Sequence, residues 1–210
     1  MAQIADPAVE GGKRARAKEL NRQAILDAAR HVFARLGYDA CSIRDIIRET
    51  NLASGTFYNY FKSKEEVFET LASDSVRRFR PLLKDVRASA QDLETYIHGA
   101  YRAYFHFLAR ENDDAISEGT PHLALIGVRV DTPEMKAVST EIRDDIVNVL
   151  QMSDTTVSDV DYLTAAAIGM AREMGDMMLS RRPIDPDSAA AFATQLLLGG
   201  LQNLPSSANR

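Results

Sequence analysis

The chain has 210 residues, of which 45% are hydrophobic and 26% charged, so it can bury a core and is neither a disordered nor a fibrous sequence. One cysteine, Cys41, excludes an intrachain disulfide, and no apolar run is long enough to predict a membrane span, so we expect a cytoplasmic protein. Residues 1–64 carry 11 Lys/Arg and 7 Asp/Glu, whereas residues 65–210 carry 14 and 23. A basic N-terminal segment on an acidic body favours a local contact with a polyanion.

An arm and a helix are the first predicted elements. Residues 1–17 contain few apolar side chains and end in the run Gly11–Arg16, which favours a flexible basic arm. From Lys18 onward, apolar residues recur at helical spacing as far as Leu36, and Gly37 supplies a stop. We therefore expect order to begin near Lys18.

Two short helices and a long one are predicted next. Ser42, with an acidic residue three positions later, has the form of an N-cap, so a short helix should run to about Glu49. The next three residues break it, and a third short helix covers roughly Ser54 to Tyr60. Ser63 then opens a capping box and a long amphipathic helix that continues through Leu83.

Beyond residue 90 the apolar pattern stays helical, and no strand, repeat or low-complexity run is predicted. The expected helices cover about 92–111, 120–130, 134–152, 158–181 and 187–203. The sequence therefore predicts an all-α protein of about nine helices.

The two short helices form the part of the chain most indicative of function. Two short helices joined by a tight turn, packed on a preceding helix and flanked by basic residues, make a helix-turn-helix, whose second helix can enter the major groove of DNA. Phe57 and Phe61 are four residues apart and should face the core. This arrangement turns the polar and aromatic residues between and beside them outward: Thr56, Tyr58, Asn59 and Tyr60.

The run from Gly55 to Glu66, GTFYNYFKSKEE, is similar to the signature G-T-[LFV]-Y-x-[HY]-F-x-[SDN]-K-[ED]-[ED] of the tetracycline-repressor (TetR) family. Residues of about 20–70 resemble the DNA-binding domain of that family. Asn51 replaces the glycine usual in the turn, and Ala53 replaces the usual Ser or Thr before the third helix. After the arm expected at 1–17, the resemblance implies a helix-turn-helix domain at 18–64 and a helical ligand-sensing and dimerisation domain at 65–210.

The same resemblance implies which residues contact double-stranded DNA. Tyr58, Tyr60 and Lys64 match positions that hold phosphates, whereas Arg44, Ser54 and Asn59 match positions that contact base edges. The full expected set is Ser42, Arg44, Ser54, Gly55, Thr56, Tyr58, Asn59, Tyr60 and Lys64. Gly55 has no side chain, so the backbone there can approach DNA closely.

The resemblance also places a small-molecule pocket among the helices of the body. Aromatic and methionine side chains at helical spacing are its candidate lining, although the same residues could form ordinary core. His122 and Arg129 are candidates to recognise a carboxylate or phosphate. The expected ligand-binding residues are Tyr101, Tyr104, Phe105, Leu108, His122, Arg129, Met170 and Met174. Arg172 and Glu173 could belong to the pocket or to a dimer interface.

Small residues in the last two predicted helices allow close helix packing: Ala165, Ala166, Ala167, Gly169, Gly175, Gly199 and Gly200. The resemblance implies a homodimer through these two helices. A two-fold dimer would bind a palindromic operator with half-sites about 34–36 Å apart, or a multiple of that turn.

We therefore expect a transcriptional repressor that a small lipophilic or aromatic ligand releases from its operator. The alternative is a DNA-binding regulator controlled by a partner or by its own concentration, which a sealed body interior would favour. No motif for nucleotide binding, zinc hydrolysis or a nucleophile elbow is present, so we expect neither an enzyme nor a cofactor. Glu94, His98 and His106 share one helix face without a second ligand cluster, so we expect a polar stripe there and no metal.

Overall fold

The computed structural model describes residues 7–113, 132–152, 157 and 159–201, with side chains from residue 14 onward. These residues form seven α-helices and one 3-10 helix, and the described part of the chain contains no strand. The all-α prediction is confirmed, while the helix expected at 120–130 lies outside the described residues. The chain divides into two compact units, Met1–Leu71 and Ala72–Arg210.

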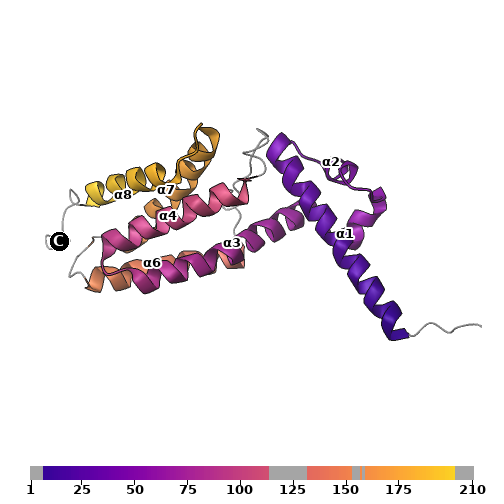
Figure 1. The fold of residues 1–210 in the computed structure, drawn as a ribbon, viewed down its shortest axis with the longest axis horizontal. Coiled ribbons are helices and arrows are strands. Elements are labelled where there is room, and N and C mark those ends of the chain that lie inside the picture. The colour runs from indigo at the N-terminus through magenta and orange to yellow at the C-terminus, as the bar shows by residue number, and fades with distance from the viewer. Residues whose placement is uncertain (1–6, 114–131, 153–156, 158, 202–210) are drawn as a thin grey trace, which may run out of the picture. The chain divides into compact units, whose positions relative to one another are not determined.

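The first unit contains α1 (Pro7–Leu36), α2 (Ile43–Arg48), the 3-10 helix η1 (Ser54–Asn59) and the start of α3 (Lys64–Ser89), as Figure 1 shows. The prediction that helix begins near Lys18 is wrong, because α1 begins at Pro7. Proline is favoured at the first helical position, and good helix formers surround the two glycines that follow. At the other end Gly37 adopts φ +78°, as a helix stop requires.

Local side-chain contacts account for the short elements. Ser42 and Asp45 form the predicted capping box at the start of α2. At the start of α3, Ser63 Oγ accepts from the Glu66 N–H, but the Glu66 carboxylate accepts from the Lys62 N–H, one residue earlier than a capping box requires. The core of this unit joins its helices through fully buried side chains: Ile25, Val32, Phe33, Ile46, Phe57 and Phe68.

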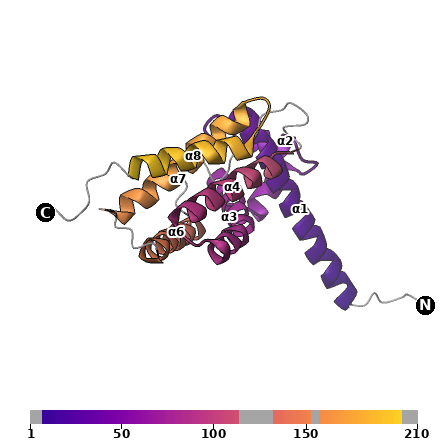
Figure 2. The same cartoon turned by 60° about the vertical axis from the view of Figure 1, so that its left-hand side comes forward.

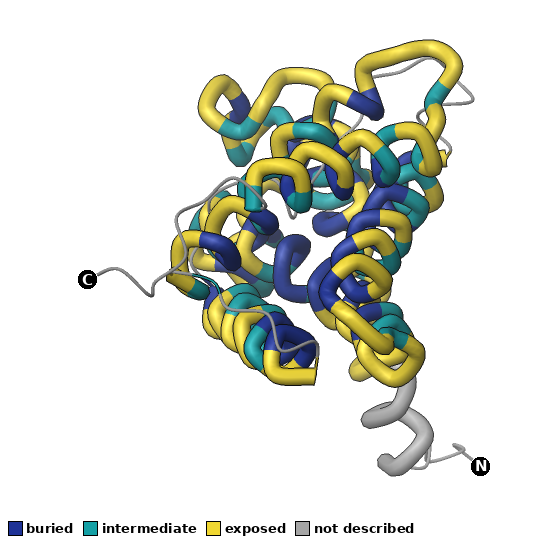
Figure 3. The backbone as a smooth tube through the Cα atoms, turned by 90° about the vertical axis from the view of Figure 1, so that its left-hand side faces the viewer, coloured by how far each residue is buried: buried dark blue, intermediate teal, exposed yellow. Residues whose placement is uncertain are grey.

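The second unit contains the rest of α3 with α4 (Leu93–Glu111), α6 (Pro133–Met152), α7 (Val160–Ser180) and α8 (Pro186–Leu201). The bounds of α4, α6, α7 and α8 agree with the predicted ranges to within two residues. Helix α4 packs against α6, α7 and α8, so it is the central helix of this unit (Figure 2). Buried residues lie on the inward sides of the helices and exposed residues on the outward sides (Figure 3).

Glycine allows two close approaches to α4. A Cβ at Gly99 would lie 2.9 Å from Val86 Cγ1 of α3, and one at Gly175 would lie 2.5 Å from Leu108 Cδ1, on α4 itself. The small-residue prediction is thus confirmed for Gly175, although the neighbour is a helix of the same chain.

A buried polar cluster joins α3, α4 and α6. Asp145 is 4% exposed and accepts hydrogen bonds from Arg87 and, at 3.0 Å, from the Tyr96 hydroxyl. Arg80 pairs with Glu141 one turn earlier on α6. Burial beside Asp145 raises the pKa of Tyr96, which keeps the phenol protonated as the donor.

Candidate functional site

The turn between α2 and η1 is organised by one side chain. Thr50 Oγ1 donates to the Ile47 carbonyl at 2.9 Å and accepts from the Leu52 N–H at 3.2 Å. These bonds link the end of α2 to the approach to η1 and so set where η1 begins.

Helix η1 presents a polar face and buries an aromatic one. Phe57 and Phe61 are 0% and 2% exposed, so the prediction that they face the core is confirmed. Tyr58 is 64% exposed. Of the other predicted contact residues in this segment, Ser54, Gly55 and Asn59 are exposed, and Thr56 and Tyr60 are half-buried. The segment is a 3-10 helix, and Ala53 provides no side-chain cap for it.

Two positions in η1 and just after it have particular surroundings. Asn21 of α1 donates to the Tyr60 hydroxyl at 3.2 Å, which holds this phenol in place at the surface. No described atom lies within 4 Å of the position that a Cβ would take on Gly55. Packing within the unit therefore does not require glycine there, and the open space suits a close approach by another molecule.

Lys64 is bound within its own unit. Its Nζ donates to the carbonyls of Tyr38 at 2.9 Å, Asp39 at 3.3 Å and Cys41 at 3.0 Å. It also lies 4.6 Å from the centre of the Tyr38 ring. Burial and a hydrogen bond to Glu65 raise the pKa of Tyr38 to about 12. All three ammonium protons thus have partners in the segment between α1 and α2.

The start of α2 lies beside this segment. Ser42 and Arg44 are exposed, and the Ser42 hydroxyl takes part in the cap with Asp45. Hydrogen bonds from Ser42 hold the pKa of Asp45 below its ordinary value. Arg48 and Lys62 are exposed cations of the same unit. The described surface of this unit therefore combines exposed hydrogen-bonding groups with exposed positive charge, as DNA recognition requires.

The second unit contains a cavity of about 850 Å³. It lies between α3, α4, α6 and α7, and its wall is mostly apolar and aromatic, with Phe79, Tyr96 and Tyr101 among the larger side chains. The Tyr101 hydroxyl donates to the Ala167 carbonyl at 3.2 Å. The Tyr104 hydroxyl is buried and has no hydrogen-bond partner within the described structure.

Two predicted ligand-binding residues, Tyr101 and Tyr104, lie on the cavity wall. Four others do not line it: Phe105 and Leu108 belong to the buried core, and Met170 and Met174 pack half-buried against that core. His122 and Arg129 lie outside the described residues. The wall also includes three charged residues that were not predicted for it, Lys136, Arg143 and Asp161. It includes Arg172 as well, for which two roles were open. In the sequence, the signal that could have identified Lys136 and Arg143 was their position next to the apolar stripe of α6.

The polar stripe on α4 makes interhelical contacts. Arg102 Nε donates to Asp187 of α8 at 2.7 Å, and His106 Nε2 lies 3.0 Å from the same carboxylate oxygen. His98 lies 3.5 Å from the Thr194 hydroxyl.

No group of three or more potential metal ligands occurs among the described residues. No helix in the described ranges combines the length and apolar character needed to cross a bilayer.

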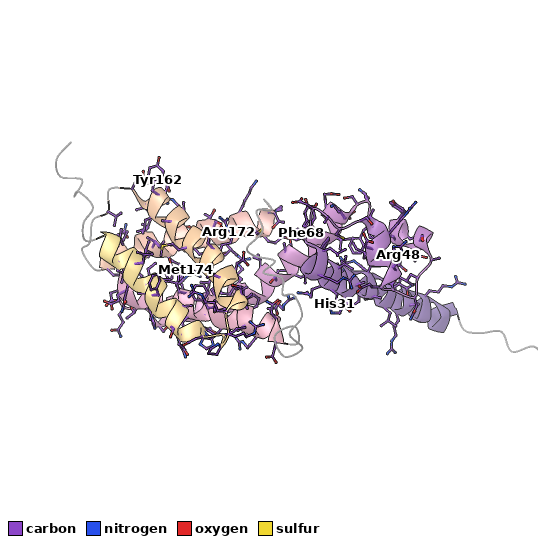
Figure 4. All side chains as sticks on the ribbon, turned by 90° about the horizontal axis from the view of Figure 1, so that it is seen from above. His31, Arg48, Phe68, Tyr162, Arg172 and Met174 are labelled. Carbon is purple, nitrogen blue, oxygen red and sulfur yellow. The ribbon has the colours of Figure 1, made fainter. Side chains whose placement is uncertain are left out.

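Helices α7 and α8 carry large apolar side chains on their outer surface. Tyr162 is 78% exposed and projects away from the neighbouring helices (Figure 4). Phe192 and Leu196 of α8 are 61% and 55% exposed. Gly169, Gly199 and Gly200 have no described atom within 4 Å of a built Cβ. Exposed apolar side chains and glycines with open surroundings suit contact with another helix.

A short exposed helix after a tight turn, on a three-helix unit with exposed basic residues, defines a helix-turn-helix DNA-binding protein. Residues 25–71 match the model of the bacterial regulatory proteins of the tetR family. The first unit is thus a DNA-binding domain of the TetR family type, and the chain is a DNA-binding transcriptional regulator.

Relatives extend the similarity beyond this unit. The uncharacterised HTH-type transcriptional regulator YdgC of Bacillus subtilis is 26% identical over 194 residues, which cover 86% of this chain and 92% of YdgC. The HTH-type transcriptional repressor AcnR of Corynebacterium efficiens is 26% identical over 162 residues, covering 73% and 85%. The crystal structure of the transcriptional regulator FadR from Bacillus subtilis in complex with stearoyl-CoA has a TM-score of 0.65 at 20% identity, covering 85% and 98%. This last likeness establishes the common fold.

Proposed function

We propose that the chain is a dimeric repressor that binds a palindromic operator and releases it when a small lipophilic or aromatic ligand occupies the cavity of the second unit. The observation that carries this proposal is the pairing of an exposed recognition segment, η1, with a large apolar cavity in the same chain. A regulator that binds chromosomal DNA would act in the cytoplasm, and binding alone, without turnover, is sufficient for this role.

The size and lining of the cavity support a ligand. Pockets for small molecules are commonly about 300–1,000 Å³ and mostly apolar with a few polar groups. The cavity of about 850 Å³ falls within this range. The FadR structure, whose fold is similar, contains stearoyl-CoA, which favours a lipophilic effector here as well. The cavity argues against the alternative of a regulator without an effector, because that alternative would favour a filled interior.

Helix α3 is the natural link between DNA and ligand. Its first residue, Lys64, binds the segment before α2, and its later residues Val76, Phe79 and Leu83 line the cavity. A ligand that favours a different position of α3 would change operator affinity. A coupling of about 1–3 kcal/mol would lower that affinity roughly 5–150-fold, which is enough to switch a promoter.

Exposed apolar groups support dimerisation through α7 and α8. Phe192, Leu196 and Tyr162 together expose much apolar surface, which favours an interaction site. One short recognition segment contacts few base pairs, so two copies are needed for useful specificity. AcnR, a relative over most of the chain, is a repressor, which supports repression as the outcome.

The proposal is tested by selecting genomic DNA fragments with the full-length protein and measuring the preferred sequence. Asn59→Ala should change the preference at one or two base pairs, whereas Tyr58→Phe should weaken binding to all sequences. Asn148→Ala, at an exposed asparagine of α6, is the matched control and should change neither. An unaltered preferred sequence for Asn59→Ala would contradict the base-contact assignment. Binding as a monomer to sites without two-fold symmetry would contradict the dimer.

A further inference from the structure

The charged residues of the cavity wall have the opposite sign to the unit around them. Within the described lining, Lys136, Arg143 and Arg172 are cations and Asp161 is the single anion. Residues 65–210 as a whole carry 14 Lys/Arg and 23 Asp/Glu. Lys136, Arg143 and Asp161 are exposed, whereas Arg172 is half-buried. Because attraction between charges is stronger in apolar surroundings than in water, Arg172 is the cation of the wall that most favours an anionic ligand.

The charged residues of the wall lie toward its two ends. Arg143 Nε donates to Asp161 at 2.6 Å, so these two charges balance each other at the start of α7. Arg172 lies eleven residues further along α7, about 16 Å away at the helical rise. Because α6 and α7 are consecutive helices with a short connection, they should run in opposite directions, and Lys136, two turns before Arg143, then lies toward the Arg172 end.

Tyr104 places an unsatisfied donor at the same end. Its Cε1 atom lies 3.3 Å from the position of a Cβ on Gly175, and Gly175 is one helical turn from Arg172. The hydroxyl is buried without a partner among the described residues. Burial raises the pKa of Tyr104, Asp176 adds to this effect and Arg172 opposes it, so the phenol stays a neutral donor. A buried donor without an acceptor destabilises the empty protein, and a ligand acceptor would relieve this cost.

The Arg172 guanidinium has N–H donors that can bind a ligand. Its side chain is 20% exposed, and it forms an ion pair with the adjacent Glu173, which is 75% exposed. An ion pair with so exposed a carboxylate contributes little, so a buried ligand anion could replace it. A guanidinium binds carboxylate or phosphate oxygens through two parallel N–H donors.

We infer that the cavity binds an elongated amphiphile whose anionic head, a carboxylate or a phosphate, contacts Arg172 and Tyr104, and whose apolar body lies along Phe79 and Tyr96 toward the Arg143–Asp161 pair. This inference rests on the proposed function, because the same cavity is the proposed effector site. It adds the chemical class of the ligand and the residues that select it.

The test compares three probes of equal chain length, dodecanoate, dodecyl phosphate and dodecanol, in calorimetric titrations of the full-length protein. At least one anion should bind about tenfold or more tightly than the alcohol, and the stronger anion identifies the head group. Arg172→Gln should remove this preference while leaving dodecanol binding nearly unchanged. Arg110→Gln, at an exposed arginine of α4 outside the wall, is the matched control and should keep the preference.

Tyr104→Phe provides a second readout that does not depend on Arg172. It should weaken binding of the preferred anion several-fold, and the empty variant should melt at the same temperature as the wild type or higher. A lower melting temperature would show that the hydroxyl has a structural partner and would overturn its role in binding. If dodecanol binds as tightly as both anions and releases operator DNA, the anionic class is wrong and the proposed function stands. If no probe binds while operator binding is intact, the inference of an amphiphilic ligand is wrong. The proposed function is then tested separately, by asking whether compounds of other classes release the operator DNA.

Discussion

Lys64→Met removes the ammonium that joins the start of α3 to the segment before α2, and methionine keeps most of the side-chain volume. Three hydrogen bonds to the carbonyls of Tyr38, Asp39 and Cys41 are lost, at 2.9, 3.3 and 3.0 Å. A hydrogen bond from a charged donor contributes about 1.5–3 kcal/mol when well shielded. Because Lys64 is half-buried and the three bonds share one group, we expect a total loss of about 2–4 kcal/mol from the free energy of unfolding of the first unit.

The effect on DNA binding separates two roles for Lys64. The family resemblance implies a phosphate contact, whereas the described contacts imply that Lys64 positions Ser42 and Arg44. Removal of a phosphate contact lowers the slope of log affinity against log salt by about 0.9. We expect Lys64→Met to weaken operator binding with the slope unchanged, because the lost function is positioning. Lys62→Met, at an exposed lysine two residues away, is the matched control for stability and should unfold like the wild type.

The measurements are urea unfolding followed by circular dichroism, and fluorescence anisotropy of labelled operator at several salt concentrations. If Lys64→Met unfolds like the wild type and its salt slope falls by about 0.9, the reasoning is refuted. In that case the ammonium leaves the three carbonyls to bind a phosphate.

Three further predictions concern the second unit. Arg87→Met leaves the buried Asp145 carboxylate without its cation and should lower the free energy of unfolding, measured in urea, by about 2–4 kcal/mol. This cost is somewhat below that of a fully buried pair, because Arg87 is 40% exposed. Adding Asp145→Leu should recover part of the loss, and an unchanged stability for Arg87→Met would contradict the role of the cluster. Gly175→Ala should destabilise by about 1–3 kcal/mol, since its Cβ would lie 2.5 Å from a side-chain carbon, whereas Gly169→Ala, in open space, should be neutral or stabilising in the same assay. Phe192→Glu should give monomers in analytical ultracentrifugation and weaken operator binding, and a variant that stays dimeric would exclude α8 from the interface.

Much of the first unit follows from interactions between residues close in sequence. The capping box of Ser42 and Asp45 and the left-handed Gly37 each involve a few neighbouring residues, and the spacing of Phe57 and Phe61 assigns the buried face of η1. The sequence therefore determined where the helix-turn-helix lies and which of its residues face outward. It placed the start of α1 too late, because tolerance of Gly11 and Gly12 depends on the flanking helix formers.

The functional details of both units depended on tertiary structure. Lys64 reaches carbonyls 23 to 26 residues away, a contact that no local pattern predicts. The cavity exists because four helices leave space between them, so Tyr104 lies on its wall while the adjacent Phe105 packs in the core. Helical periodicity identifies an apolar face but not the neighbour it meets, and only the packing of α7 against α4 and α6 brought Arg172 and Tyr104 to the same cavity.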